Sequence, residues 1–380
     1  MIQPANRLQE TKEYYFSRKL KEVRALEAEG HPIINMGIGS PDVPAPEEVV
    51  EALEKAFENP KVHQYQSYVG IPELREAMAA FYKTHYNVTV NPANEVLPLM
   101  GSKEGIMHIS MAFLNPGDEV LIPNPGYPTY SAVTKLVEAV PVFYDLEAAN
   151  GWLPDLDALQ KQDLSKVKIM WVNYPHMPTG AVATTDFYKE VIAFGKANDI
   201  LIVNDNPYSF ILNEHPISIL NVAGAKEVAL ELNSLSKSFN MAGWRVGMVM
   251  GSQDHIGHVL KVKSNMDSGM FYGIQQGAIA ALKIDTSWFV AINALYQKRR
   301  ERIYELVKKL NCTCEENGVG LFVWAKLPDS VEAEAFIDRV LYDKHIFITP
   351  GTVFGSQGEG YIRFSLCVTE EQIKNAIDRF

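Results

Sequence analysis

The sequence is poor in cysteine, and this scarcity limits the kinds of protein that it can encode. Three cysteines among 380 residues are too few for a disulfide framework, so a reducing cytoplasm is the expected compartment. Cys312 and Cys314 form a lone Cys-x-Cys with no second Cys or His pair at zinc spacing. We therefore assign no metal from the sequence.

Positive charge and long apolar runs are also scarce. Lys and Arg number 35 against 46 for Asp and Glu, which gives a formal net charge of −11. An acidic chain repels nucleic-acid phosphates and anionic lipid, so we expect neither as a partner. The first twenty residues lack an apolar signal core, and no apolar run reaches spanning length, which predicts neither export nor membrane insertion.

Repeats, low-complexity tracts and Gly/Pro-rich linkers are absent as well, so any domain boundary must lie within structured chain. A length of 380 residues exceeds the usual size of one domain. We expect a large domain over 36–270 and a small domain formed by 1–35 together with 271–380.

What is present is an alternation of β-rich runs and helical patterns over 95–251, typical of an α/β fold whose mostly parallel sheet has helices on both faces. The tail has a long helical pattern over 287–310 and two further strand patterns, which suit a smaller α+β domain. The expected sheet strands are 95–100, 119–123, 167–173, 200–204, 228–232 and 246–250, and those of the tail are 320–327 and 361–367.

Polar residues follow several of these strands, where ligand sites of such sheets gather. Gly101, Ser102 and Lys103 come at a strand-to-helix junction, whose free backbone amides suit a phosphate. The segment 233–247 is the most specific, because Ser234, Ser236, Lys237 and Arg245 combine phosphate donors, a primary amine and an anion clamp. A single loop lysine would ordinarily be solvated, but the hydroxyl groups and the arginine near Lys237 favour a catalytic role for it.

Ser234-x-x-Lys237, with Arg245 eight residues after the lysine, resembles the signature of the class I/II aminotransferases of pyridoxal phosphate fold type I. The resemblance extends from about Arg7 to the C-terminus, with several separate motifs in the family's order. It implies that pyridoxal 5′-phosphate is bound to Lys237 as a Schiff base and that Lys237 is also the general base. Ser102, Ser234, Ser236 and Arg245 would hold the phosphate.

Other motifs of the resemblance assign further cofactor contacts. In Asp205-x-x-Tyr208 the carboxylate would pair with the pyridinium nitrogen and the phenol with the ring O3′, so that the ring becomes an electron sink. Tyr127 would cover the ring face, and Asn173 would also contact the cofactor. Tyr65 would reach the phosphate of a neighbouring subunit, which implies a homodimer with shared sites.

The resemblance also assigns substrate contacts. Arg363, an isolated charge in an alternating strand pattern, would bind the α-carboxylate of the substrate with two hydrogen bonds. Ile38 and Gly39 would line the path of the substrate, and Tyr15, beside Tyr14, would lie at its mouth. One position departs from the family: Met177 stands before Pro-Thr-Gly, where an asparagine commonly donates to O3′. A thioether cannot donate, and Asn173 or His176 are the candidates to replace that donor.

These assignments predict transfer of an amino group from an L-amino acid to a 2-oxo acid. A β-eliminating lyase of the same fold would use the same residues and is not excluded. A non-catalytic effector domain would need a DNA-binding segment that the chain lacks, and no Gly-x-Gly-x-x-Gly follows a strand, which argues against a nicotinamide dehydrogenase. No second arginine is marked for a distal carboxylate, and the segment 263–271 faintly resembles branches acting on alanine or LL-diaminopimelate. The sequence therefore does not name the substrate.

Overall fold

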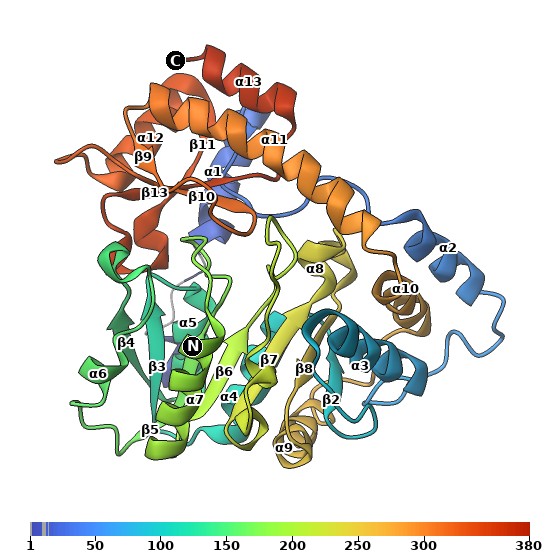
Figure 1. Cartoon of the computed structure of the whole chain (residues 1–380). Coiled ribbons are helices and arrows are strands. Elements are labelled where there is room, and N and C mark those ends of the chain that lie inside the picture. The colour runs from blue at the N-terminus through green and yellow to red at the C-terminus, as the bar shows by residue number, and fades with distance from the viewer. Residues whose placement is uncertain (1, 10–12, 14) are drawn as a thin grey trace.

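A computed structural model describes residues 2–9, 13 and 15–380 of the chain (Figure 1). The helices are α1 Tyr15–Ala28, α2 Glu47–Ala56, α3 Pro72–Tyr86, α4 Ser102–Phe113, α5 Pro128–Leu136, α6 Leu156–Leu159, α7 Thr185–Asn198, α8 Leu235–Ser238, α9 Gln253–Lys263, α10 Tyr272–Leu282, α11 Ser287–Lys309, α12 Ala333–Lys344 and α13 Glu370–Asp378. The strands of the central sheet are β2 Val96–Leu99, β3 Glu119–Asn124, β4 Val140–Asp145, β5 Val167–Val172, β6 Leu201–Asp205, β7 Ala229–Ser234 and β8 Gly247–Met250.

The central sheet has seven strands in the order β2-β8-β7-β6-β5-β3-β4. Strand β8 is antiparallel to both of its neighbours, and the other pairings are parallel. This confirms the expected α/β class with a mostly parallel sheet. The observed strands match the predicted runs to within one or two residues at each end.

Helices cover both faces of the sheet because its side chains alternate between two cores. On β3, Val120 and Ile122 pack into the core under α4, α5 and α9, whereas Leu121 points into the opposite core with residues of α3 and α7. Both faces are therefore buried, as the continuous apolar runs of the inner strands require.

Strand β4 was not among the strands expected from the sequence. It lies at the edge of the sheet beside β3, and Val140 and Phe143 are 46% and 52% exposed. Pro141 also removes one backbone donor, which an edge position tolerates. The run from Ala139 to Tyr144 is apolar, but a proline within such a run argues against a central strand.

Helix α1 and the C-terminal part of the chain from α11 onward form a smaller assembly, shown at the top of Figure 1 with the C-terminus. Its antiparallel sheet has the order β12-β13-β10-β9, and β1 pairs in parallel with β11. These strands are β1 Ile34–Asn35, β9 Thr313–Cys314, β10 Phe322–Lys326, β11 Ile346–Phe347, β12 Thr349–Pro350 and β13 Tyr361–Ser365. The pairing of β1 with β11 brings an N-terminal segment to the C-terminal part of the fold, and the domain boundaries at 36 and 270 stay a prediction.

No single helix of the described chain is both long enough and apolar enough to cross a membrane; α10 and α11 reach that length and composition only as a pair, across a bend of 85°.

Candidate active site

A cavity of about 660 Å³ opens at the carboxyl ends of the central strands and extends to the small sheet. Its walls bring together most of the residues singled out from the sequence. They are Ile38, Gly39, Ser102, Lys103, Tyr127, Asn173, Asp205, Tyr208, Ser234, Ser236, Lys237, Arg245 and Arg363. The parallel strands gather the residues that follow their carboxyl ends, whereas Ile38, Gly39 and Arg363 come from outside the central sheet.

Lys237 enters the cavity from α8, directly after β7. Its amine donates a hydrogen bond to the backbone carbonyl of Gly39 at 2.5 Å. Burial lowers the pKa of Lys237, and the positive charges of Arg363 and Arg245 act in the same direction. A lowered pKa leaves more of the amine neutral, which is the form that attacks a carbonyl carbon or takes a proton.

Asp205, at the end of β6, is a buried carboxylate with one oxygen left unsatisfied. The Tyr130 hydroxyl donates to Oδ2 at 2.9 Å, while Oδ1 makes no hydrogen bond with any described residue. Burial raises the pKa of Asp205 to about 7. A buried oxygen without a donor suits a cationic N–H group brought by a ligand, whose charge would restore the ionised carboxylate.

A cluster of polar groups behind Asp205 holds the neighbouring residue Asn204. Glu231, fully buried on β7, accepts hydrogen bonds from Asn204 Nδ2 and from the Tyr82 hydroxyl, both at 3.0 Å. Asn204 Oδ1 in turn accepts from the backbone N–H of Tyr174 at 3.2 Å. Burial raises the pKa of Glu231. This cluster, Tyr82, Asn204 and Glu231, fixes the ends of β5 and β6 from the far side of the sheet.

The junction of β2 and α4 forms a cradle for an anion. Gly101 caps α4 at a φ of +89°, and a Cβ there would collide with the Arg245 guanidinium. A Cβ on Gly247 would lie 2.6 Å from the backbone nitrogen of Ser102. Burial, followed by the charge of Arg245, lowers the pKa of Lys103. Two cations and a helix N-terminus at this point create an unfavourable positive potential that a phosphate would relieve.

Arg363 lies on β13 at the opposite side of the cavity and is 4% exposed. Its guanidinium stands 3.9 Å above the ring centre of Phe322 and 4.7 Å from that of Phe354. Nη2 donates to the carbonyl of Gly37 at 2.7 Å. The two phenyl rings and the Gly37 carbonyl fix the plane of the guanidinium. A guanidinium held in this way can bind a carboxylate with two hydrogen bonds.

Met177 also lines the cavity, and both candidates to replace its missing donor have hydrogen-bond partners of their own. Asn173 Nδ2 donates to the backbone carbonyl of Asp205 at 2.5 Å, and its Oδ1 accepts from Met177 N at 3.0 Å. His176 does not line the cavity; its Nδ1 lies 2.8 Å from Thr179 Oγ1, and burial lowers its pKa to about 3. The asparagine and the histidine therefore organise the loop.

Four residues singled out from the sequence are not part of the cavity wall: His176, Gly101, which adjoins it beside Ser102, and the two tyrosines Tyr15 and Tyr65. Tyr15 lies in a separate hollow between α1 and α12, and Tyr65 is 90% exposed. Tyr14 lies outside the described residues. The expected roles of Tyr15 at the substrate mouth and of Tyr65 in a neighbouring subunit stay predictions.

Sequence reasoning missed three residues that shape the site. Tyr130 positions Asp205, and its ring stacks on Trp171 with centres 4.9 Å apart. Phe322 supports Arg363, and Glu231 holds Asn204. Tyr130 lies in the same short motif as Tyr127, so the sequence could have revealed it. Phe322 and Glu231 contact residues that are distant in the sequence, and no local motif marks them.

The polar groups of the cavity fit a flat, cationic nitrogen heterocycle that carries a phosphate. The unsatisfied oxygen of Asp205 suits the ring nitrogen, and the cradle at Gly101 and Arg245 suits the phosphate. Lys237 would then lie beside the ring, with Arg363 across from it.

Comparisons with known proteins agree with this geometry. A family profile described as aminotransferase class I and II matches residues 31–380. The LL-diaminopimelate aminotransferase of Maridesulfovibrio salexigens is 40% identical over 99% of this chain and 97% of its own length, and that of Aquifex aeolicus is 39% identical over 100% and 98%. Among solved structures, apo BacF from Bacillus subtilis is 37% identical with a TM-score of 0.96, covering 100% of this chain and 98% of its own. A single mutant of Thermus thermophilus aspartate aminotransferase is 25% identical with a TM-score of 0.92, covering 100% and 99%.

Proposed function

This chain belongs to the class I and II aminotransferase family and is an aminotransferase, and we propose that it works with pyridoxal 5′-phosphate bound to Lys237. The observation that carries the proposal is the convergence of Lys237, Asp205 and the Gly101 cradle on one cavity. The two alternatives left by the sequence, a β-eliminating lyase and an effector domain, are not the activity of the relatives named above.

When bound, the cofactor supplies an electron sink that stabilises negative charge at the substrate Cα. Asp205 would hold the ring nitrogen in its cationic form, with Tyr130 fixing the carboxylate. Tyr208 would donate to the ring hydroxyl oxygen, and Tyr127 would cover the ring. Lys237 would hold the cofactor, and its amine, whose pKa burial lowers, would take and return a proton at the substrate Cα.

The substrate is proposed to be an amino acid with an apolar or aromatic side chain. Arg363 would bind the α-carboxylate, which all donors share. Ser17 and Ser40 are the uncharged polar residues that the N-terminal segments add to the cavity wall. Six apolar side chains line the cavity with Arg363: Phe16, Leu20, Ile38, Met177, Phe322 and Phe354. A distal carboxylate or ammonium group placed among them would lose its hydration without a partner, which costs several kcal/mol in an apolar environment. LL-Diaminopimelate, the substrate in the names of the relatives, carries both groups and is the second candidate.

We further propose that the protein is a homodimer with shared sites. Exposed apolar side chains gather on α2, on the loop that follows it and on the segment after α9. Phe57, Tyr65, Tyr68, Met266 and Phe271 are between 37% and 90% exposed. Such a concentration is unusual for a surface that stays in water. A partner covering it would bring Tyr65 toward a second cavity, as its family motif implies.

Half-reactions with single donors test the cofactor and the substrate separately. The cofactor-loaded protein is mixed with phenylalanine, leucine, methionine, glutamate or LL-diaminopimelate, and the visible absorbance is followed until the amino group has moved to the cofactor. We expect fast reaction with the first three donors and slow reaction with the last two. A preference for LL-diaminopimelate would refute the apolar substrate class and leave the aminotransferase assignment intact. Failure of every donor, in a protein that binds the cofactor, would refute the transfer itself.

A further inference from the structure

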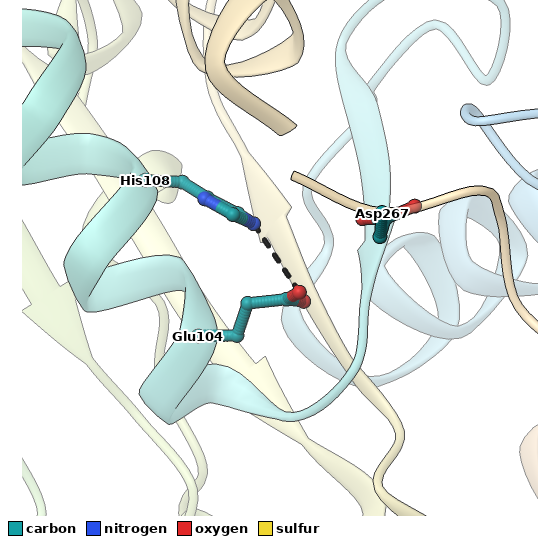
Figure 2. Close-up of side chains that lie close together, drawn as sticks. All are labelled: Glu104, His108 and Asp267. Carbon is teal, nitrogen blue, oxygen red and sulfur yellow. Dashed lines mark ion pairs between the residues drawn. The ribbon is translucent and has the colours of Figure 1, made fainter. Parts of the chain in front are cut away.

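A second group of chemically active side chains does not line the cavity and lies beside the first two turns of α4. Glu104 and His108 are one turn apart on that helix, and Asp267 approaches from the segment after α9 (Figure 2). One ligand atom from each lies within 4.8 Å of the other two. None of the three has a role in the proposed transfer reaction.

We propose that Glu104, His108 and Asp267 bind a divalent cation of the zinc class. One imidazole nitrogen with two carboxylate oxygens is a donor set that suits Zn²⁺, Co²⁺ or Mn²⁺ and is too nitrogen-rich for a typical Ca²⁺ site. Three protein ligands leave a fourth position for water.

The spacing of two ligands already fits a tetrahedral centre. His108 Nε2 lies 3.3 Å from Glu104 Oε1. Two ligands bound at about 2.0 to 2.1 Å in tetrahedral geometry are separated by about 3.3 Å, so a cation could sit between them with small adjustments. Figure 2 shows the histidine ring directed at the carboxylate, with Asp267 on the other side of the gap.

The burial of His108 is a second observation that points to a ligand. The side chain is 2% exposed, its Nε2 faces the Glu104 carboxylate at 3.3 Å without the geometry of a hydrogen bond, and its Nδ1 has no partner among the described residues. Leaving a buried polar group without a partner costs about 1 to 3 kcal/mol. Coordination of a cation by Nε2 would remove part of that cost.

The remaining carboxylate oxygens are held as those of metal ligands usually are. Glu104 Oε2 accepts from the backbone N–H of Met100 at 2.6 Å, and Asp267 Oδ1 accepts from that of Gly269 at 2.8 Å. Such outer hydrogen bonds orient the ligand atoms before the metal arrives.

Lys263 competes with a cation at this site. Its amine lies 2.8 Å from Asp267 Oδ2 and also donates to the carbonyl of Tyr68 at 3.0 Å, and the side chain is 3% exposed. The carboxylates of Glu104 and Asp267 carry two negative charges and the Lys263 ammonium carries one positive charge, so one net negative charge remains to attract a cation. Binding therefore requires that the ammonium keep Oδ1 and Tyr68 and release Oδ2, and Lys263 should weaken the site.

The ion would join two parts of the fold that serve the cavity. Helix α4 carries Ser102 and Lys103 of the anion cradle. Gly269, two residues after Asp267, has a φ of +86° and leaves no room for a Cβ beside the carbonyl of Gln66. The cation would therefore fix the cradle helix relative to the loop that presents Tyr65.

Direct metal binding tests the proposal. Tag-free protein, loaded with cofactor and stripped by a chelator, is dialysed against Zn²⁺, and bound metal is measured by elemental analysis. We expect one zinc per chain. Glu104→Gln and His108→Gln should each weaken binding by more than the 10- to 100-fold typical of losing an outer contact. His258→Gln, which removes an exposed histidine from nearby α9, is the matched control and should bind as the wild type does.

Two further measurements keep the test independent of folding defects. Co²⁺ bound to the wild type should give the intense visible bands of a tetrahedral site, which requires no variant. Lys263→Met should bind Zn²⁺ more tightly, because it removes the competing ammonium. Absence of stoichiometric zinc, weak octahedral cobalt bands, unchanged binding in Glu104→Gln and His108→Gln, or no tightening in Lys263→Met would each overturn the site as described.

Discussion

The sulfur of Met177 lies 3.3 Å from Nη1 of Arg363, so a thioether and a guanidinium meet where the cofactor and the substrate carboxylate would come together. The sulfur accepts weakly and donates nothing. Asn173, an amide in the cavity wall, donates one of its two N–H groups to the Asp205 carbonyl. Tyr208 and the second N–H of Asn173 are therefore the donors available to the ring hydroxyl oxygen of a bound cofactor.

Replacing Met177 with asparagine should lower the pKa of the imine nitrogen that joins Lys237 to the cofactor. An additional donor would stabilise negative charge on the ring oxygen and so weaken that oxygen's hold on the imine proton. Titration of the visible absorbance measures this pKa in the wild type and in Met177→Asn. An unchanged or higher value in the variant would show that another donor already serves the oxygen.

Lys237→Ala should abolish turnover and the covalent bond to the cofactor. The anion cradle, with Ser102, Ser234 and Arg245, does not depend on the amine, so the variant should still bind pyridoxal phosphate reversibly. Borohydride reduction followed by peptide mass analysis identifies the bonded lysine. Labelling of any other lysine in the wild type would contradict the assignment.

Arg363→Lys should reduce kcat/KM for every donor by a similar factor. Lysine keeps the charge but loses the forked geometry and the flat contact with Phe322, which is worth roughly 1.5 to 3 kcal/mol, or about 10- to 100-fold. Steady-state kinetics with an apolar and an acidic donor measure the factor. If kcat/KM fell for the acidic donor alone, Arg363 would instead bind the side chain of the substrate.

Asp205 should destabilise the cofactor-free protein as the pH rises. Its pKa is near 3.8 in the unfolded chain and is raised to about 7 in the fold by burial, so the folded state holds the proton more tightly. The resulting stabilisation is complete below pH 4 and is lost as the pH rises to 7 and beyond. At about 1.4 kcal/mol per pKa unit, the loss is a few kcal/mol.

Urea unfolding of the cofactor-free wild type and Asp205→Asn at several pH values checks this prediction. The difference in free energy of unfolding between the two proteins should move in favour of the asparagine variant from pH 5 to pH 8. Bound cofactor should abolish the trend in the wild type. A difference that is independent of pH would contradict it.

The parts of the site that could be predicted from the sequence are those that follow a strand directly. Lys237 and Asp205 each stand at the end of an apolar run, and a parallel sheet brings such ends together without further information. Glu231 could not be found in this way, because its polar partners come from α3 and β6. Asp267 likewise meets Glu104 and His108 only after the chain has folded.

The ends of the strands also depend on contacts that the sequence alone does not reveal. The run ending at residue 204 was expected to stop before Asp205, but β6 continues to that residue because Asp205 pairs with Leu232. Hydrogen bonds with a neighbouring strand extend an element beyond its own apolar residues. A single sequence does not record that pairing.

Asn204 and Asp205 are consecutive on β6 and point to opposite faces of the sheet, one into the cluster with Glu231 and the other toward the cavity. Attempts to stabilise the enzyme by replacing the polar cluster with apolar residues would therefore alter the strand that bears Asp205, the carboxylate proposed to pair with the cofactor ring. A library designed to raise thermal tolerance should leave Tyr82, Asn204 and Glu231 unchanged. The opposite choice, randomising these three positions alone, changes the support of Asp205 without replacing any residue proposed to contact the cofactor.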